Sequence, residues 1–190
     1  MKTLKLNYIT STDDLRPSLQ YIQFNENGFI YATNAHILIK TTMVDALGAE
    51  FEPLKDIWDK HKEIRIHSSE WKKISGKDLL LCKVLMEADN KAIVQFRDKK
   101  SEYTVTFLTG DFEAGFPKCE AVIPTASLEA IEKIGIDGAL FNQLTMCVKS
   151  SVNTTHFKLE FRSELRGIIL THIELENTTF LLMPFKVSEV

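Results

Sequence analysis

The sequence predicts an α+β protein made mostly of antiparallel strands with a few short helices. Short segments of apolar or alternating residues recur along the 190 residues, with turn residues between them, and this pattern is typical of strands. The order strand, helix, three strands occurs twice, from residue 63 to 108 and from residue 131 to 184. The repeat indicates two copies of one unit, with helices packed on one side of the sheets.

The first third of the chain contains a hairpin as its strongest local signal. Asn25-Glu26-Asn27-Gly28 lies between two apolar runs, and Asn-Gly tolerates the positive φ of a tight turn. Residues 44–62 have no clear period and contain Pro53, so we expect a surface connection with a short helix at 54–60. Strands are expected at residues 3–8, 19–24, 29–40 and 63–67.

A short helix followed by strands is predicted for the middle of the chain. The helix starts near residue 70, where Ser68 or Ser69 can cap it, and Gly76 is well placed to end it. Pro124 ends the last strand because proline cannot donate a ladder hydrogen bond. The strands are expected at residues 79–87, 91–97, 102–108 and 119–123.

The last third is predicted to be one helix and three closing strands. Asp137 can cap a helix over residues 138–149, which places Leu140, Phe141 and Leu144 on one face. The strands are expected at residues 156–161, 167–173 and 178–184.

Composition bounds the class of protein. With 44% apolar and 26% charged residues, the chain can form one substantial core or two small domains. A net charge of −3 excludes a surface that is basic all over, so any nucleic-acid contact needs a local patch. The three cysteines lack metal-ligand spacing, and no apolar run reaches the roughly 18 residues that span a bilayer. We expect a cytoplasmic protein with no membrane contact.

Three motifs in the same order resemble the bacterial sliding clamp, the β subunit of DNA polymerase III. Residues 32–38, A-T-N-A-H-I-L, resemble the family's A-T-D-G-H-R-L. Residues 115–124, G-F-P-K-C-E-A-V-I-P, resemble G-R-F-P-D-Y-R-R-V-L-P, and residues 182–187, L-M-P-F-K-V, resemble V-M-P-M-R-L. A fourth stretch, residues 14–19, is similar to the family's strand entry.

The resemblance implies a shortened clamp. Residues 1–124 look like the clamp's middle domain, and residues 125–190 look like the second half of its C-terminal domain. A first domain is not represented. A ring around DNA would therefore need a different stoichiometry from the family's two chains of three domains, or does not form.

The resemblance also implies a peptide-binding groove for polymerase or repair proteins. Carried over position by position, its lining would be Leu19, Thr33, Ala35, His36, Leu38, Pro117, Val122, Leu181, Met183, Pro184 and Phe185. Ala35 stands for the family's Gly, Ile37 for its Arg and Lys118-Cys119 for its Asp-Tyr, so one edge should be less polar. The alternative is that Leu38, Val122 and Leu181 are ordinary core residues.

Duplex DNA would be held by diffuse phosphate contacts from basic residues. The candidates lie on the first predicted helix, its exit and one turn: Lys72, Lys73, Lys77, Arg97, Lys99 and Lys100. Such short runs are more often solvated faces or edge protection.

Catalysis has little support in the sequence. The five histidines have no paired-ligand spacing, and no phosphate loop or nucleophile motif is present. We expect no cofactor, no metal and no enzymatic activity. Two readings stay open: a clamp-like docking or processivity factor that associates with DNA as a homo-oligomer, and a clamp-derived scaffold or decoy without DNA binding.

Overall fold

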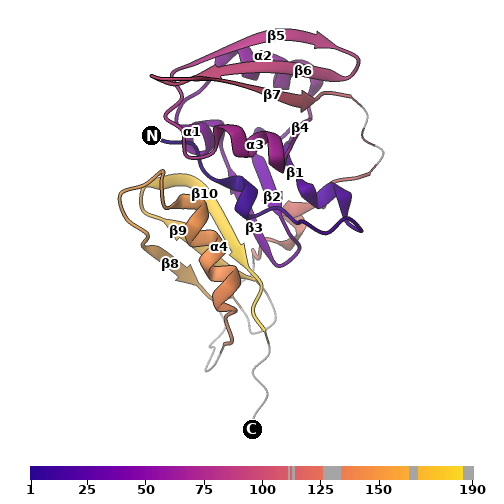
Figure 1. Ribbon diagram of the computed structural model, residues 1–190. Coiled ribbons are helices and arrows are strands. Elements are labelled where there is room, and N and C mark those ends of the chain that lie inside the picture. The colour runs from indigo at the N-terminus through magenta and orange to yellow at the C-terminus, as the bar shows by residue number, and fades with distance from the viewer. Residues whose placement is uncertain (111, 113, 126–133, 163–166, 186–190) are drawn as a thin grey trace.

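The computed structural model describes residues 1–110, 112, 114–125, 134–162 and 167–185. In this part of the chain, ten strands form one antiparallel sheet in the order β5-β6-β7-β4-β1-β2-β3-β10-β9-β8 (Figure 1). The strands are β1 Tyr21–Phe24, β2 Ile30–Thr33, β3 Ile37–Thr41, β4 Ile64–His67, β5 Leu81–Ala88, β6 Lys91–Arg97, β7 Glu102–Leu108, β8 Phe157–Glu160, β9 Ile168–His172 and β10 Leu175–Leu182.

The helices are short, which confirms the α+β prediction. They are the 3-10 segments η1 Leu6–Tyr8, η2 Pro17–Gln20 and η3 Cys119–Val122, and the α-helices α1 Met43–Leu47, α2 Glu52–His61, α3 Ser68–Ile74 and α4 Gly138–Val148. Asp137 caps α4 as predicted, because its carboxylate accepts from the backbone N–H groups of Ala139 and Leu140 at 2.7 and 3.2 Å. The cap of α3 is His67 and not Ser68 or Ser69, since its Nδ1 accepts from Ser69 N.

The repeated unit is present as predicted in its first copy. β4, α3, β5, β6 and β7 follow one another. The second copy has α4 followed by β8, β9 and β10, and before α4 a single bridge pairs Gly135 with Phe185. The expected start of this copy at residue 131 lies outside the described residues.

The predicted hairpin is confirmed, but its second arm is two strands. β1 pairs with β2 across a turn in which Gly28 has φ +81°. The run 29–40 is broken at Ala35, which has φ +77°, and β3 then folds back against β2 with Ile30 opposite Thr41. Alanine gives no sequence signal for this conformation, which glycine and asparagine favour.

Two predicted strands are wrong. Residues 3–5 have no regular secondary structure and Leu6–Tyr8 form η1. Backbone bonds of this segment go to helix ends, since Leu4 N donates to Ala46 O and Lys5 N to Cys147 O. Residues 119–122 form η3 and not a strand, and Cys119 N donates back to Pro117 O at 2.8 Å. The connection at 44–62 is also more ordered than expected, since α1 was not predicted and α2 packs on β5.

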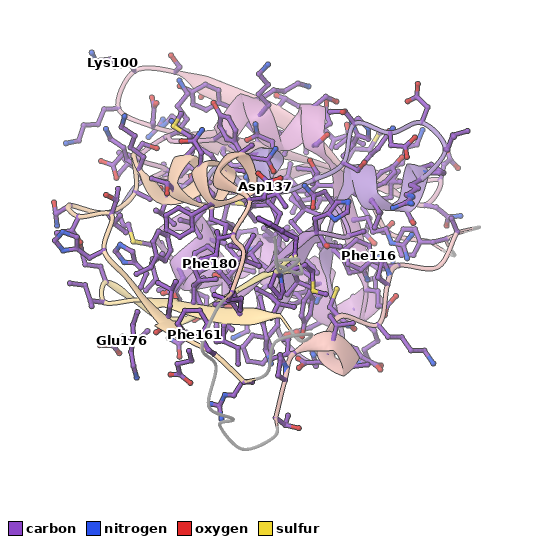
Figure 2. The ribbon with its side chains drawn as sticks, turned by 90° about the horizontal axis from the view of Figure 1, so that it is seen from below. Lys100, Phe116, Asp137, Phe161, Glu176 and Phe180 are labelled. Carbon is purple, nitrogen blue, oxygen red and sulfur yellow. The ribbon has the colours of Figure 1, made fainter. Side chains whose placement is uncertain are left out.

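The main core lies between one face of the sheet and the helices. α3 contacts β4 and β7, α4 contacts β10, and η1 contacts both α3 and α4 (Figure 1). Trp71 of α3 and Phe180 of β10 are fully buried in this core, and Figure 2 shows Phe180 inside the molecule.

The sheet runs without a break from one predicted domain to the other. β3 pairs with β10, with Leu38 opposite Leu181. The core likewise includes Leu47 and Leu144. The division into residues 1–124 and 125–190 stays a prediction.

Candidate functional site

The floor of the candidate site is a row of side chains on the outer face of the sheet, the face opposite α3 and α4. Successive strand residues point to opposite faces, so Leu38 faces outward while its neighbours Ile37 and Ile39 enter the main core. The strand register places Thr33 beside Leu38, Leu38 beside Leu181, and Leu181 beside Ile169. All four are less than 10% exposed, so the floor is preformed and largely apolar.

The turn between β2 and β3 forms one rim. Asn34 Oδ1 accepts from the backbone N–H of His36 and of Ile37, at 3.0 and 2.9 Å, and Thr33 Oγ1 accepts from Ala35 N at 3.1 Å. His36 O in turn accepts from Met183 N at 2.9 Å. These bonds fix Ala35, His36 and Met183 at the edge of the floor.

A wall stands over the floor on residues 114–125, here called the wall segment. Its η3 turn places Cys119 against a second, smaller core that contains Tyr31, Leu38, Ile169 and Leu181. Phe116 and Ile123 pack on the same cluster. Floor, rim and wall therefore come from three parts of the chain that are far apart in sequence.

Together these surfaces enclose a groove of about 840 Å³. It is lined by nine of the residues predicted from the sequence: Leu19, Thr33, Ala35, His36, Leu38, Pro117, Val122, Leu181 and Met183. Val122 of the wall is 55% exposed and Met183 of the rim 37% exposed, so both offer accessible apolar surface above a buried floor.

Pro184 and Phe185 are not among the lining residues. Phe185 N donates to Gly135 O at 3.1 Å, and its ring lies so close to Gly135 that an added Cβ there would approach it to 2.6 Å. The bridge to Gly135 holds Phe185 against the segment before α4.

The sequence prediction missed several lining residues, among them Cys119, Ile123 and Gly167. Cys119 and Ile123 line the groove from η3 and the residue that follows it, where the sequence predicted a strand. Gly167 reaches the groove through the pairing of β9 with β10, which no local motif indicates.

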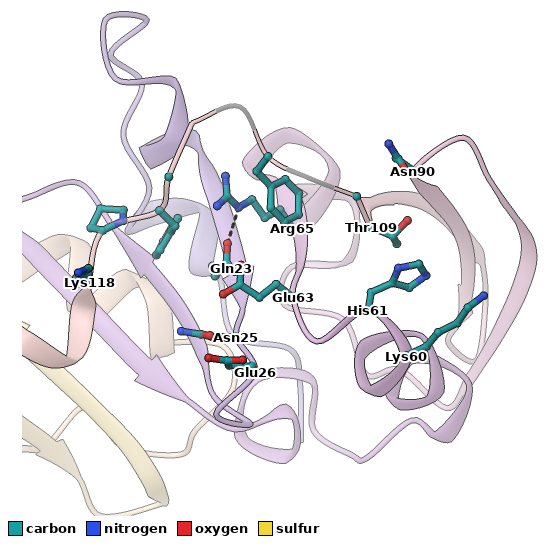
Figure 3. A pocket seen from close by; sticks show the side chains of 15 residues that line it. Gln23, Asn25, Glu26, Lys60, His61, Glu63, Arg65, Asn90, Thr109 and Lys118 are labelled. Carbon is teal, nitrogen blue, oxygen red and sulfur yellow. Dashed lines mark hydrogen bonds between the residues drawn. The ribbon is translucent and has the colours of Figure 1, made fainter.

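A second hollow of about 930 Å³ lies across the wall segment, and Pro117 and Lys118 line both hollows. Figure 3 shows its polar lining around Arg65. Arg65 is 5% exposed, and its Nε donates to Gln23 Oε1 at 2.5 Å. Its guanidinium lies 3.9 Å from the centre of the Phe112 ring, and burial lowers its pKa. Glu26 and Glu63 also line this hollow, so its charge is mixed.

The predicted DNA-contacting residues lie on α3, its exit and the β6–β7 end of the sheet. Lys77 lies over the Tyr103 ring at 5.2 Å, and Tyr103 donates to Asp98 of the turn that carries Lys99 and Lys100. Lys72 is exposed on α3 and Arg97 ends β6, while Lys100 lies at the edge of the molecule in Figure 2. Lys73 forms an ion pair with Glu70 at 2.6 Å, and this pairing weakens the attraction of Lys73 for another anion.

The titratable groups give no sign of a reaction centre in the described part of the chain. Burial raises the pKa of the Cys82 and Cys119 thiols to about 12 and that of Cys147 still further, so the three thiols stay protonated near neutral pH. No group of three potential metal ligands occurs among the described residues. No described helix is long and apolar enough to cross a membrane.

No protein-family model matches the chain, and no curated protein matches it. Solved structures do match it. The sliding clamp of Bacillus subtilis superposes with a TM-score of 0.58 and 11% identity over 96% of this chain and 60% of that chain. The Thermotoga maritima DNA polymerase III β subunit gives 0.57 and 9% over 97% and 63%. The Bartonella birtlesii clamp bound to griselimycin gives 0.56 and 12% over 96% and 63%.

The chain therefore has the fold of the bacterial sliding clamps, as its motifs suggested. It spans about three fifths of the length of these clamps.

Proposed function

We propose that this protein is a sliding-clamp-like docking factor that binds short linear peptides of DNA polymerases or repair proteins in the groove. The observation that carries the proposal is the convergence of three distant segments on one apolar groove in a clamp fold. The protein performs no reaction in this role and needs no cofactor.

The groove suits a peptide with one or two large apolar side chains. The buried pair Leu38 and Leu181 offers a rigid surface for an anchor, and a few such anchors supply most of the affinity of an interface. Met183 at the rim is flexible and polarisable, so it adapts to different partner side chains.

The test is a titration of a fluorescent clamp-binding peptide, followed by anisotropy. We expect micromolar affinity. Met183→Ala should weaken it about tenfold, because truncation of an anchor contact commonly costs more than about 1 kcal/mol. Phe185→Ala is the matched control, since Phe185 is equally apolar and 54% exposed but lies outside the groove lining.

Two results would refute peptide docking in the groove. One is no binding of the peptide at high concentration. The other is an equal loss of affinity in the Met183 and Phe185 variants. Griselimycin, which the Bartonella clamp binds, serves as a second probe: it should compete with the peptide if both occupy the groove.

We further propose that the docking factor associates with duplex DNA as a homo-oligomer, through the lysines near α3 and the β6–β7 turn. Counterion release makes such binding weaken steeply with salt. Retention on DNA should therefore fall between low and physiological salt, with a molar mass in solution above that of one chain. Lys77→Glu combined with Lys100→Glu should abolish it.

A scaffold or decoy without DNA binding is the second candidate. The pairing of Lys73 with Glu70 favours it. Peptide binding by a strict monomer that is not retained on DNA even at low salt would decide for the scaffold.

A further inference from the structure

The wall of the groove is attached to the sheet in an unusual way. The backbone hydrogen bonds of η3 are local: Cys119 N donates to Pro117 O, Ala121 N to Lys118 O and Ile123 N to Glu120 O. A strand would have shared a ladder of hydrogen bonds with its neighbours, whereas the backbone hydrogen bonds of this turn all stay within residues 117–123. The position of the wall over the floor thus depends on side chains.

Glu120 carries the main polar attachment. Its Oε1 accepts from the hydroxyl of Tyr31, from Lys40 Nζ at 2.6 Å and from Asn27 Nδ2 at 3.3 Å. Asn27 Nδ2 also donates to the Tyr31 hydroxyl at 2.7 Å, and Lys40 Nζ lies 4.1 Å from the centre of the Phe29 ring. One carboxylate therefore gathers donors from β2, β3 and the hairpin turn.

The ionisation of this cluster suits a permanent attachment. Hydrogen bonds from Lys40 and Tyr31 lower the pKa of Glu120, so the carboxylate is charged at neutral pH. Burial, and then the bond to Glu120, raises the pKa of Tyr31, so its hydroxyl keeps the proton that it donates. Charge-assisted bonds of this type are stronger than neutral ones.

The donors belong to the same strands as the groove floor. Tyr31 is two residues before Thr33 on β2, and Lys40 is two residues after Leu38 on β3, so each donor lies on the same face as a floor residue. On the wall, the neighbours of Glu120 in η3 include Cys119 and Val122, which line the groove. Glu120 thus links wall to floor outside the groove itself.

The other end of the wall segment has an attachment of its own. Arg65 on β4 donates to Ala114 O at 2.6 Å, and its guanidinium lies 5.8 Å from the centre of the Phe116 ring. Figure 3 shows Arg65 beside the chain that leads toward Lys118. With this end held by a buried arginine, movement of the wall should be concentrated at η3.

We propose that Glu120 is the positioning residue of the groove: by binding Tyr31 and Lys40 it holds η3 over the floor and so sets the affinity for an apolar peptide. This inference rests on the proposed function for the affinity, but the position of the wall can be tested without any ligand. Loss of the carboxylate should let η3 lift and expose the thiol beside it.

Cys119 reports the position of the wall. Cys119 is 5% exposed and Cys147 is fully buried, so in a Cys82→Ser background the one thiol whose exposure depends on η3 is Cys119. In this background Glu120→Ala should react with a thiol reagent about fivefold faster at Cys119, the scale of a partly exposed charge-assisted bond. Glu120→Gln keeps a neutral acceptor and should fall between the alanine variant and the parent.

The matched control is Glu50→Ala. Glu50 pairs with Lys55 at 2.7 Å and its side chain is 48% exposed, close to the 50% of Glu120, but it lies away from the groove. The unfolding midpoint of each variant in urea shows whether faster labelling follows global destabilisation. Peptide anisotropy on the same variants should show about fivefold weaker binding for Glu120→Ala only.

The outcomes separate the two proposals. Faster labelling in Glu120→Ala with a parent protein that binds no peptide would support the positioned wall and refute the proposed function. Unchanged labelling, or an equal rise in Glu50→Ala, would overturn the role of Glu120 whether or not peptide binds.

Discussion

Gly167 lines the groove beside Leu181, and replacing it with alanine should fill part of the groove. An added Cβ would lie 2.5 Å from Leu181 Cδ1 and 2.6 Å from Cγ. Carbon atoms in contact lie about 3.5 to 4.0 Å apart, so the Leu181 side chain must retreat by about 1 Å. Leu38 and Ile169 flank it on the neighbouring strands, which leaves the groove as the open side.

The expected magnitude follows from overpacking. Added methyl groups in a packed site cost about 1 to 3 kcal/mol, so Gly167→Ala should lower the free energy of unfolding by about that amount in urea titration. Peptide affinity should fall about two- to tenfold if half of this cost is met in the groove. Gly115→Ala is the control, because a Cβ there meets nothing within 4 Å, and its stability should stay within about 0.5 kcal/mol of the parent.

A double-mutant cycle sharpens the test. Leu181→Ala removes the side chain that the new methyl group would touch, so the two substitutions together should cost less than the sum of the single changes. Strict additivity, or a Gly167→Ala variant that matches the parent in both stability and peptide affinity, would refute the packing of Gly167 on Leu181.

Three further predictions concern stability. Trp71→Phe leaves Leu4 O without the indole donor at 2.9 Å, so the free energy of unfolding in guanidinium should fall by about 1 to 3 kcal/mol. Ala35→Gly should raise the thermal midpoint, because glycine relieves a φ of +77° at a gain of up to about 1 kcal/mol; a lowered midpoint would contradict this strain. The pKa of Glu174 is lowered below its ordinary value of 4.5 mainly by the Asn153 N–H. The charged carboxylate therefore stabilises the folded protein fully above pH 4.5, and this stabilisation is lost as the pH falls through the lowered pKa. Glu174→Gln should flatten the pH dependence of the melting temperature there, and an unchanged acid limb would speak against the bond.

Local signals in the sequence predicted most of the fold. The Asn-Gly hairpin, the Asp137 cap and the strands around the Asp89-Asn90 turn all rely on contacts within a few residues. The strand prediction for residues 3–8 was wrong because their apolar residues are buried by helices from elsewhere in the chain and not by a neighbouring strand.

The groove was predictable only in part, for a related reason. Thr33, Leu38 and Met183 belong to motifs that a reader can find in the sequence. Glu120 and Gly167 depend on partners that only the folded sheet brings close, Lys40 and Leu181. The sequence pattern alone could not show that Glu120 holds the wall or that Gly167 leaves room beside Leu181.

Part of the packing of residues 3–6 comes from a segment that is made much later. Thr3 accepts at its carbonyl from Ser151 Oγ, 148 positions along the chain, and Lys5 N bonds Cys147 O. During synthesis one side of this apolar stretch stays without its native cover until residues 147–151 have been made. Closing so long a loop costs conformational entropy before the contacts that stabilise it have formed. The packing that joins α3 to α4 through η1 should therefore complete late in folding, and the nascent chain should depend on protection of residues 3–8 until then.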